Sequence, residues 1–280
     1  MNYKTINRKL LILVILWGLL FSFDQDNFLY SDCFYPSLQT WFAELSQGYS
    51  ILHLAAMDGN ESMVKFLLDM EVDPNQRNRW GETALQSLMA EKDYSDQLEM
   101  ITLLLQAGTD PNSSNTAGIT PVHIAAGGNS EQIMKLLIDF GGNLNSIDSQ
   151  GNTPVHFASA NPDEEMIQLV VENSGDLNIC NLSGESPLHW AVGNGNFFHV
   201  QILIDHGADL DIQDFSGNTP LHWAVFSENP DMVNLLISNN CDWSIKNNQN
   251  LTAGDIAEKY LTYSKNFSLI RQILISADQN

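Results

Sequence analysis

The stretch SPLHWAVGNGNFFHVQILIDHGADLDIQDFSGNTPLHWA (residues 186–224) contains one six-residue pattern twice, as SPLHWA and TPLHWA, with starts 33 residues apart. Outward from it, the pattern recurs as TPVHFA (153–158) and TPVHIA (120–125), and more weakly as SILHLA (50–55), TALQSL (83–88) and TAGDIA (252–257). The seven starts are separated by 33, 37, 33, 33, 33 and 33 residues. A fixed period of this length indicates stacked copies of one supersecondary unit.

The rest of each unit repeats as well. A glycine stands two residues before six of the starts, at Gly48, Gly81, Gly118, Gly151, Gly184 and Gly217. Paired aliphatic residues recur at 67–68, 104–105, 137–138, 170–171, 203–204, 236–237 and 269–270. We number the units 1 to 7 by the first residue of the pattern in each, and we count the loop that holds the preceding glycine as part of the same unit. These first residues are Ser50, Thr83, Thr120, Thr153, Ser186, Thr219 and Thr252.

Each unit predicts two helices joined by short polar turns. The Thr or Ser is a good helix cap, and proline is tolerated at the first helical position because its missing N–H has no helical partner there. In unit 5, Leu188, Trp190 and Ala191 form an apolar stripe at helical spacing. One unit cannot bury its own stripe, whereas stacked units share a continuous core. We therefore expect Trp190 and the corresponding Trp223 to lie in that core.

These segments resemble the T-P-L-H-x-A signature of ankyrin repeats. The resemblance implies an all-α solenoid with short β-hairpin fingers, made of about six to seven repeats. We expect residues 48–280 to form the array, with 252–280 as the C-terminal capping repeat and 24–47 as an N-terminal capping segment containing a helix near PSLQTWFAEL (36–45). Unit 2 is four residues longer, within 87–100, so its first helix or the following turn is expected to be extended.

The first 23 residues predict export or membrane attachment. Lys4, Arg8 and Lys9 precede the apolar stretch from Leu10 to Phe23. This order is typical of a secretory signal peptide, and the 14 apolar-stretch residues span about 21 Å, which is short for a membrane of about 30 Å. No small-residue cleavage site follows. A cleaved signal, with a periplasmic or secreted array, and an uncleaved short membrane anchor both remain open.

The charge excludes some partners. The chain has 12 Lys plus Arg and 34 Asp plus Glu, a formal net charge of −22. Such a chain repels nucleic acid and anionic membrane surfaces, so neither is expected as a partner. Residues 136–245 contain fifteen acids and no Lys or Arg. This acidity suits a partner with a basic surface, and it equally suits simple solubility.

The sequence offers no catalytic, cofactor or metal site. Five of the seven histidines occupy the fourth position of the pattern, where the resemblance implies bonds to backbone and to the Thr hydroxyl. Their spacing of one per unit, about 10 Å, is too long for shared zinc ligation. Cys241 takes a small core position and Cys180 lies in a finger. The Asp-rich turn DLDIQDFSGN (209–218) lacks the calcium-loop order, so local backbone bonding is the better interpretation.

The resemblance implies a non-catalytic module, monomeric, that binds a protein partner on its concave side, through finger tips and the exposed ends of the first helices. Candidate binding residues there are Trp80, Arg79, Leu182, Phe215, Phe226 and Met57. Packing against the next finger is the alternative for each large apolar residue. A membrane-tethered scaffold, a chaperone-like accessory to an extracytoplasmic enzyme, and a secreted bacterial effector are the alternative functions.

Overall fold

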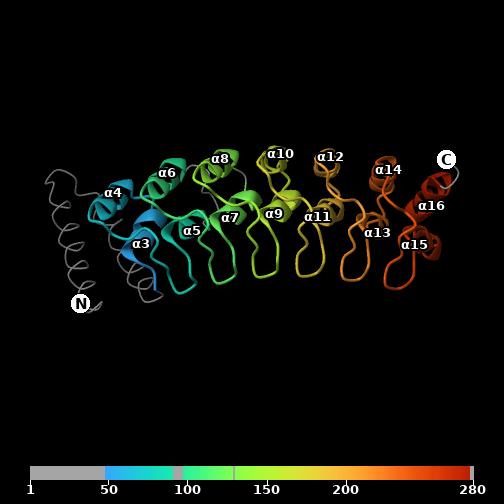
Figure 1. Cartoon of the computed structure of the whole chain (residues 1–280), viewed down its shortest axis with the longest axis horizontal. Helices are drawn as coiled ribbons and strands as arrows, with labels where there is room; N and C mark the ends of the chain where they lie inside the picture. Colours follow the sequence, from blue (N-terminus) through green and yellow to red (C-terminus); the bar gives the residue numbers. More distant parts are fainter. Residues whose placement is uncertain (1–47, 91–96, 129, 278–280) are drawn as a thin grey trace, which may run out of the picture.

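A computed structural model describes residues 48–90, 97–128 and 130–277, which form fourteen helices stacked in a row in two layers (Figure 1). The first helices of the units form one layer: α3 (Ile51–Met57), α5 (Ala84–Met89), α7 (Pro121–Gly127), α9 (Pro154–Ala160), α11 (Pro187–Gly193), α13 (Pro220–Phe226) and α15 (Ala253–Lys259). The second helices form the other: α4 (Glu61–Asp69), α6 (Leu98–Gln106), α8 (Glu131–Asp139), α10 (Glu164–Glu172), α12 (Phe197–Asp205), α14 (Pro230–Ser238) and α16 (Lys265–Ala277). The predicted helical solenoid is confirmed.

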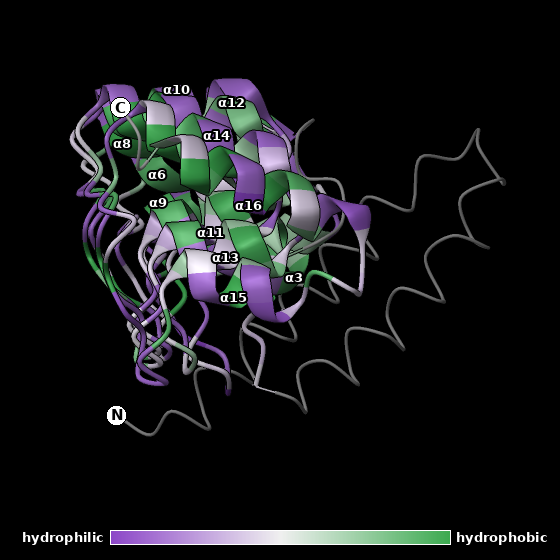
Figure 2. Ribbon diagram, turned by 90° about the vertical axis from the view of Figure 1, so that its right-hand side faces the viewer, coloured by the Kyte–Doolittle hydropathy of each residue, from purple (hydrophilic) through white to green (hydrophobic). Residues whose placement is uncertain are grey.

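The first helices begin where the repeated pattern begins. In unit 3, the Thr120 side chain accepts the backbone N–H of His123, and Pro121 occupies the first helical position. These helices are only six or seven residues long, too short to be stable alone. Their stability comes from packing: viewed along the array, apolar residues gather between the two layers (Figure 2). One buried cluster runs from Ile51 in unit 1 to Leu274 in unit 7.

The histidine at the fourth pattern position makes the same hydrogen bonds in five units and links each of these units to the next. In unit 4, His156 Nδ1 accepts the N–H of Thr153 at 3.0 Å, which leaves Nε2 to donate to the Glu185 carbonyl of unit 5 at 3.1 Å. The same bridges run from His53, His123, His189 and His222 to the following unit. All five rings are at most 1% exposed. The structural role expected for these histidines is confirmed.

Two units replace this histidine without losing the cap. In unit 2, Gln86 Oε1 accepts the Thr83 N–H at 3.0 Å, and its Nε2 donates to the Ile119 carbonyl at 2.8 Å. Glutamine therefore reproduces both bonds. In unit 7, Asp255 accepts the Thr252 N–H at 2.9 Å. A carboxylate has no proton to donate, so Asp255 caps its own helix and makes no bridge onward.

The fingers are the loops that precede each unit's first helix and project to one side of the array (Figure 1). The expected β-hairpins are not formed, since the described residues contain no strand. The reason lies in the first finger residue: Asn115 Oδ1 accepts the N–H groups of Ala117 and Ile119, which a strand ladder would otherwise use. Neighbouring fingers are joined by backbone bonds of 2.8–3.0 Å, from Thr116, Ser149, Leu182, Phe215 and Asn248 to the finger before.

The finger glycines are required by this close approach. Gly217 has φ +77°, and a Cβ there would lie 2.6 Å from the backbone N of Asn248 in the next finger. Any side chain would therefore push the two fingers apart.

The Asp- and Asn-rich turns after the second helices bond locally, as expected. Asp110 Oδ1 accepts the Asn112 N–H at 2.9 Å, and Asn112 then donates to the Gly141 carbonyl and accepts the Asn143 N–H of the next unit. Hydrogen bonds of side-chain amides thus connect the turns of successive units. Among the described residues, no three His, Cys, Asp or Glu side chains are grouped to hold a metal ion.

Several predicted segments lie outside the described residues. These are the N-terminal signal or anchor (1–23), the capping segment (24–47) with its helix near 36–45, and six residues of the unit 2 extension (91–96). The first helix of that unit, α5, ends at Met89 and is not lengthened. In the part of the chain that is described, no helix is long and apolar enough to span a membrane. The domain limits stay predictions.

Candidate functional site: the finger face

The finger face is the surface made by the finger tips and the neighbouring sides of the first helices. It carries four of the predicted binding residues as exposed side chains. Leu182 and Phe215 at finger tips are 66% and 73% exposed, and Phe226 at the end of α13 is 50% exposed. Arg79 is also exposed, whereas Trp80 and Met57 are half-buried. The structure places all six on this face but does not bring them into one cluster.

Trp80 lies in a stack of side chains. The Arg79 guanidinium carbon is 4.0 Å from the centre of the Trp80 ring, and the Tyr49 ring centre is 5.4 Å away. The Arg79 contact is a cation–π interaction, which favours a fixed ring. Trp80 is thus held in place by its neighbours while one part of it remains exposed.

A hollow of about 390 Å³ lies beside Trp80, between the fingers of units 1 to 3 and the first helices of units 1 and 2. It brings together two predicted residues, Met57 and Trp80, with others that sequence reasoning missed. The full lining is Tyr49, Met57, Trp80, Glu82, Ser87, Ala90, Asn115, Thr116 and Ala117. Leu182, Phe215 and Phe226 do not line it.

Farther along the array, aromatic rings line the same face. Phe157, Trp190 and Trp223 occupy the fifth pattern position of units 4 to 6, and Phe157 and Trp190 stand 6.2 Å apart between ring centres. Trp190 packs edge-on against His156 of the unit before, and Trp223 against His189, each at 5.5 Å. Both tryptophans are half-buried, so the expectation that they lie fully in the core is only partly right.

Each of these tryptophans has a finger carboxylate as its partner. Trp190 Nε1 donates to Glu185 at 2.9 Å, and Trp223 Nε1 donates to Asp214 at 3.0 Å. An indole N–H that is not fully exposed needs such an acceptor. Burial raises the pKa of the Asp214 carboxyl, but the bonds from the Trp223 indole, Asn218 and Ser216 together outweigh burial and leave that pKa lowered. Glu185 and Asp214 are features of the face that the sequence pattern alone did not single out.

The family to which the stacked units belong follows from their match to a protein-family model. A model described as ankyrin repeats (3 copies) matches residues 29–113, 87–179 and 156–247, well over half of the chain. The chain belongs to the ankyrin repeat family. Ankyrin repeats are protein–protein interaction modules, and proteins of this family are generally non-catalytic.

Individual relatives share part of this ankyrin array. Cyclin-dependent kinase 4 inhibitor B of Bos taurus is 40% identical over 73 residues, which is 26% of this chain and 52% of that protein. Cyclin-dependent kinase inhibitor 2A of Monodelphis domestica is 36% identical over 73 residues, which is 26% of this chain and 40% of that protein. The chain thus spans about half or less of the length of the curated relatives it matches.

Among solved structures, the ankyrin repeat domain of Bcl-3, a member of the IκB protein family, is similar over most of the array. It has a TM-score of 0.70 and 27% identity, and the match covers 81% of this chain and 99% of that one. The similarity therefore extends over the stacked units and not over one repeat alone.

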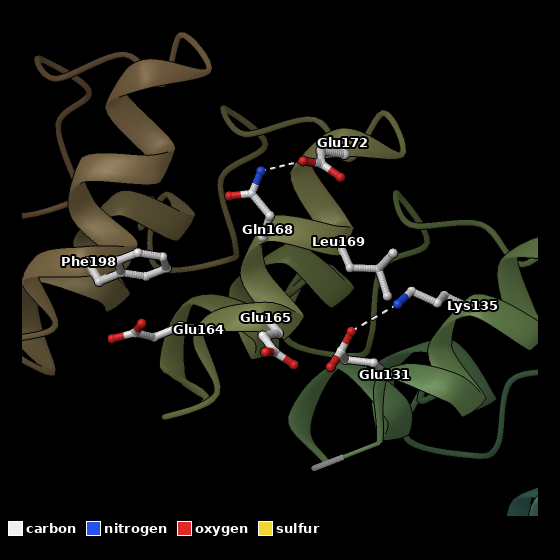
Figure 3. A pocket seen from close by; sticks show the side chains of 8 residues that line it. All are labelled: Glu131, Lys135, Glu164, Glu165, Gln168, Leu169, Glu172 and Phe198. Atoms are coloured by element: carbon white, nitrogen blue, oxygen red, sulfur yellow. Dashed lines mark hydrogen bonds and ion pairs between the residues drawn. The ribbon is translucent and has the colours of Figure 1, made fainter.

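Acidic groups dominate both sides of the ankyrin array. On the second helices, a cleft of about 310 Å³ is lined by Glu131, Lys135, Glu164, Glu165, Gln168, Leu169, Glu172 and Phe198 (Figure 3). Lys135 pairs with Glu131 at 2.9 Å, and the pKa of the Glu165 carboxyl is raised because Glu131 lies beside it. Acid is therefore not confined to the finger face.

Each histidine of the described residues makes at least one structural hydrogen bond. Burial lowers the pKa of all five bridging histidines, and the imidazoles stay neutral as bridges. Outside the pattern, His206 Nδ1 bonds to the Ile202 carbonyl at 2.8 Å, whereas buried His199 Nδ1 bonds to Ser159 and its Nε2 has no partner.

Neither cysteine of the described residues is an activated nucleophile. Cys241 is buried, as expected for a small core residue, and burial raises the pKa of its thiol to about 12. Cys180 is exposed, as expected for a finger residue, and its pKa is raised as well. A catalytic thiol needs a lowered pKa instead.

Proposed function

We propose that this protein is a non-catalytic binding module that holds one protein partner on its finger face. The observation that carries the proposal is the exposure of large apolar side chains at finger tips. The residues at the tip position of the other described fingers are Arg79, Thr116, Ser149 and Asn248. The scaffold therefore does not need Leu182 or Phe215 to be apolar. Burying one large apolar side chain under a partner surface contributes about 1.5–3 kcal/mol to the free energy of binding.

The proposal extends to the nature of the partner. Because residues 136–245 hold fifteen acids and no Lys or Arg, a basic partner surface is attracted at long range. The array acts as a monomer with one bound partner in this proposal. The kinase inhibition named for the two curated relatives belongs to those proteins, and it supports only a general role in protein binding here.

Removing the exposed tips is expected to weaken partner capture at least tenfold. The full-length chain is compared with the double variant Leu182→Ala, Phe215→Ala in cross-linking capture from its native cells, quantified by mass spectrometry. The matched control is Phe140→Ala, Phe198→Ala, which removes two aromatics of 39% and 41% exposure near the ends of second helices. Equal capture by the tip variant and the unchanged chain would count against the finger face.

We also propose that the array works outside the cytoplasm. The support is the order of basic residues and apolar stretch in residues 1–23. Fractionation of the native protein, with the mass of its N-terminus, tests this. A soluble exported form beginning near Asp24 is expected for a cleaved signal, and an intact chain in the membrane fraction for a tethered scaffold. An intact, soluble cytoplasmic chain would contradict both.

A further inference from the structure

In the part of the chain that the structure describes, the floor of the finger face is open beside Trp80. In units 4 to 6, the fifth pattern position is filled by Phe157, Trp190 and Trp223, whereas unit 2 has Ser87 there. At the end of the first helix, unit 1 has Met57 and unit 2 has Ala90 at the corresponding position. Two small side chains in one unit thus leave the hollow of about 390 Å³.

The walls of this hollow suit a large apolar side chain. Trp80, held by Arg79 and Tyr49, forms one wall, Met57 lines another part, and Ala117 belongs to the third finger. Glu82 is the acidic lining residue, and its carboxylate already accepts Asn78 Nδ2 at 2.8 Å. The volume of about 390 Å³ is large enough for one large apolar side chain.

The negative charge of the same face indicates which side chains the rest of a bound ligand carries. Over units 5 and 6 the carboxylates of Glu185 and Asp214 are fixed by the tryptophan N–H groups. No Lys or Arg lies in that part of the sequence to neutralise them. Fixed acceptors beside aromatic rings favour Lys or Arg, which gain from both the carboxylate and the ring.

We propose that the finger face binds an extended segment of a basic protein, with one large apolar side chain of that segment in the hollow and its Lys or Arg side chains over units 5 and 6. This inference rests on the proposed function. Units repeat at about 10 Å, and an extended chain advances about 3.3 Å per residue, so each unit matches about three residues. The hollow lies at unit 2, so unit 5 is three repeat steps away. The basic residues therefore fall about nine and twelve positions from the apolar residue.

Selection of random 16-residue peptides displayed on phage, with the full-length chain as bait, tests this prediction. Enriched peptides are expected to share one Trp, Phe, Leu or Met and Lys or Arg at about the spacing above. Their dissociation constants are then measured by fluorescence anisotropy on variants. Ser87→Phe copies Phe157 into the hollow, and Ala90→Met copies Met57, so each fills it in a way the chain already tolerates. Both are expected to weaken binding at least tenfold.

Two further variants separate the hollow from the charge. Phe198→Ala alters an exposed aromatic ring on the second helix α12, away from the finger face, and is expected to leave affinity within about twofold, a change of about 0.4 kcal/mol. Glu185→Gln with Asp214→Asn keeps acceptors for the indoles but removes both charges, and is expected to weaken binding and flatten its salt dependence. Circular dichroism of each variant verifies that the array is folded.

The outcomes separate this inference from the proposed function. If the peptides bind Ser87→Phe and Ala90→Met with the same affinity as the unchanged chain, the hollow does not bind their apolar side chain. Enrichment of peptides without an apolar residue leads to the same conclusion. If their binding is still lost in Leu182→Ala, Phe215→Ala, the finger face remains the binding surface. Peptides unaffected by every finger-face variant overturn both proposals. Failure to enrich any peptide overturns the extended-segment inference and leaves the capture experiment to decide the function.

Discussion

Replacing His156 with alanine is expected to destabilise the array by about 3–5 kcal/mol, from two orphaned buried polar groups and a cavity. The ring is completely buried, and it accepts the N–H of Thr153 while donating to the Glu185 carbonyl of the next unit. Alanine leaves both groups without partners, one in each unit. It also removes the edge contact with Trp190. Guanidinium unfolding followed by circular dichroism and tryptophan fluorescence measures the loss.

His156→Gln is the matched control for this experiment. Gln86 already makes both bonds in unit 2, accepting from Thr83 and donating to the Ile119 carbonyl. Glutamine at position 156 is therefore expected to cost less than about 1.5 kcal/mol, within the range of substitutions that keep hydrogen bonding and approximate volume. If alanine and glutamine were equally disruptive, the bridge to Glu185 would not be the stabilising feature.

Acidification from pH 7.5 to 5.5 is expected to lower the unfolding free energy, by at most about 1.4 kcal/mol per pH unit for each bridging histidine. Burial lowers the pKa of His53, His123, His156, His189 and His222 in the folded chain. The unfolded histidines accept protons near pH 6.5, before the folded ones do. Stability is therefore complete above about pH 6.5 and falls as the pH drops below it.

The measurement is chemical unfolding at a series of pH values and constant ionic strength. Most carboxyl groups titrate nearer pH 4, so the interval above pH 5.5 isolates the histidines. His156→Gln removes one of six buried histidines with a lowered pKa, the five bridging ones and His199, and is expected to reduce the slope by about a sixth. A stability that is flat from pH 7.5 to 5.5 would refute the neutral-bridge account.

The repeated pattern predicts most of the fold because each of its residues has a local role. Thr120 caps, Pro121 starts a helix and His123 bridges, and all three roles follow from residue type and spacing. The β-hairpin fingers are the part that fails. Asn115 and its equivalents use their side chains as acceptors for finger N–H groups, and spacing does not reveal that competition.

The candidate site depends on contacts between units, which one unit's pattern does not contain. Trp223 is half-buried because it lies against Gly193 of the previous unit, where a Cβ would be 3.0 Å from the ring. The hollow likewise exists because Ser87 and Ala90 face the finger of another unit. The sequence singled out the large residues Trp80 and Met57, whereas the space beside them is created by the small ones.

The end of the array has a consequence for self-association. Every described unit before the last offers a histidine or glutamine that donates to the finger of the unit after it, whereas Asp255 offers only an acceptor. A second copy stacked on unit 7 as an eighth repeat would place a finger carbonyl against this carboxylate, and both would be buried without a proton between them. Asp255 in the last described repeat is therefore expected to disfavour head-to-tail stacking of a second copy on unit 7, the contact by which identical units would otherwise form open filaments.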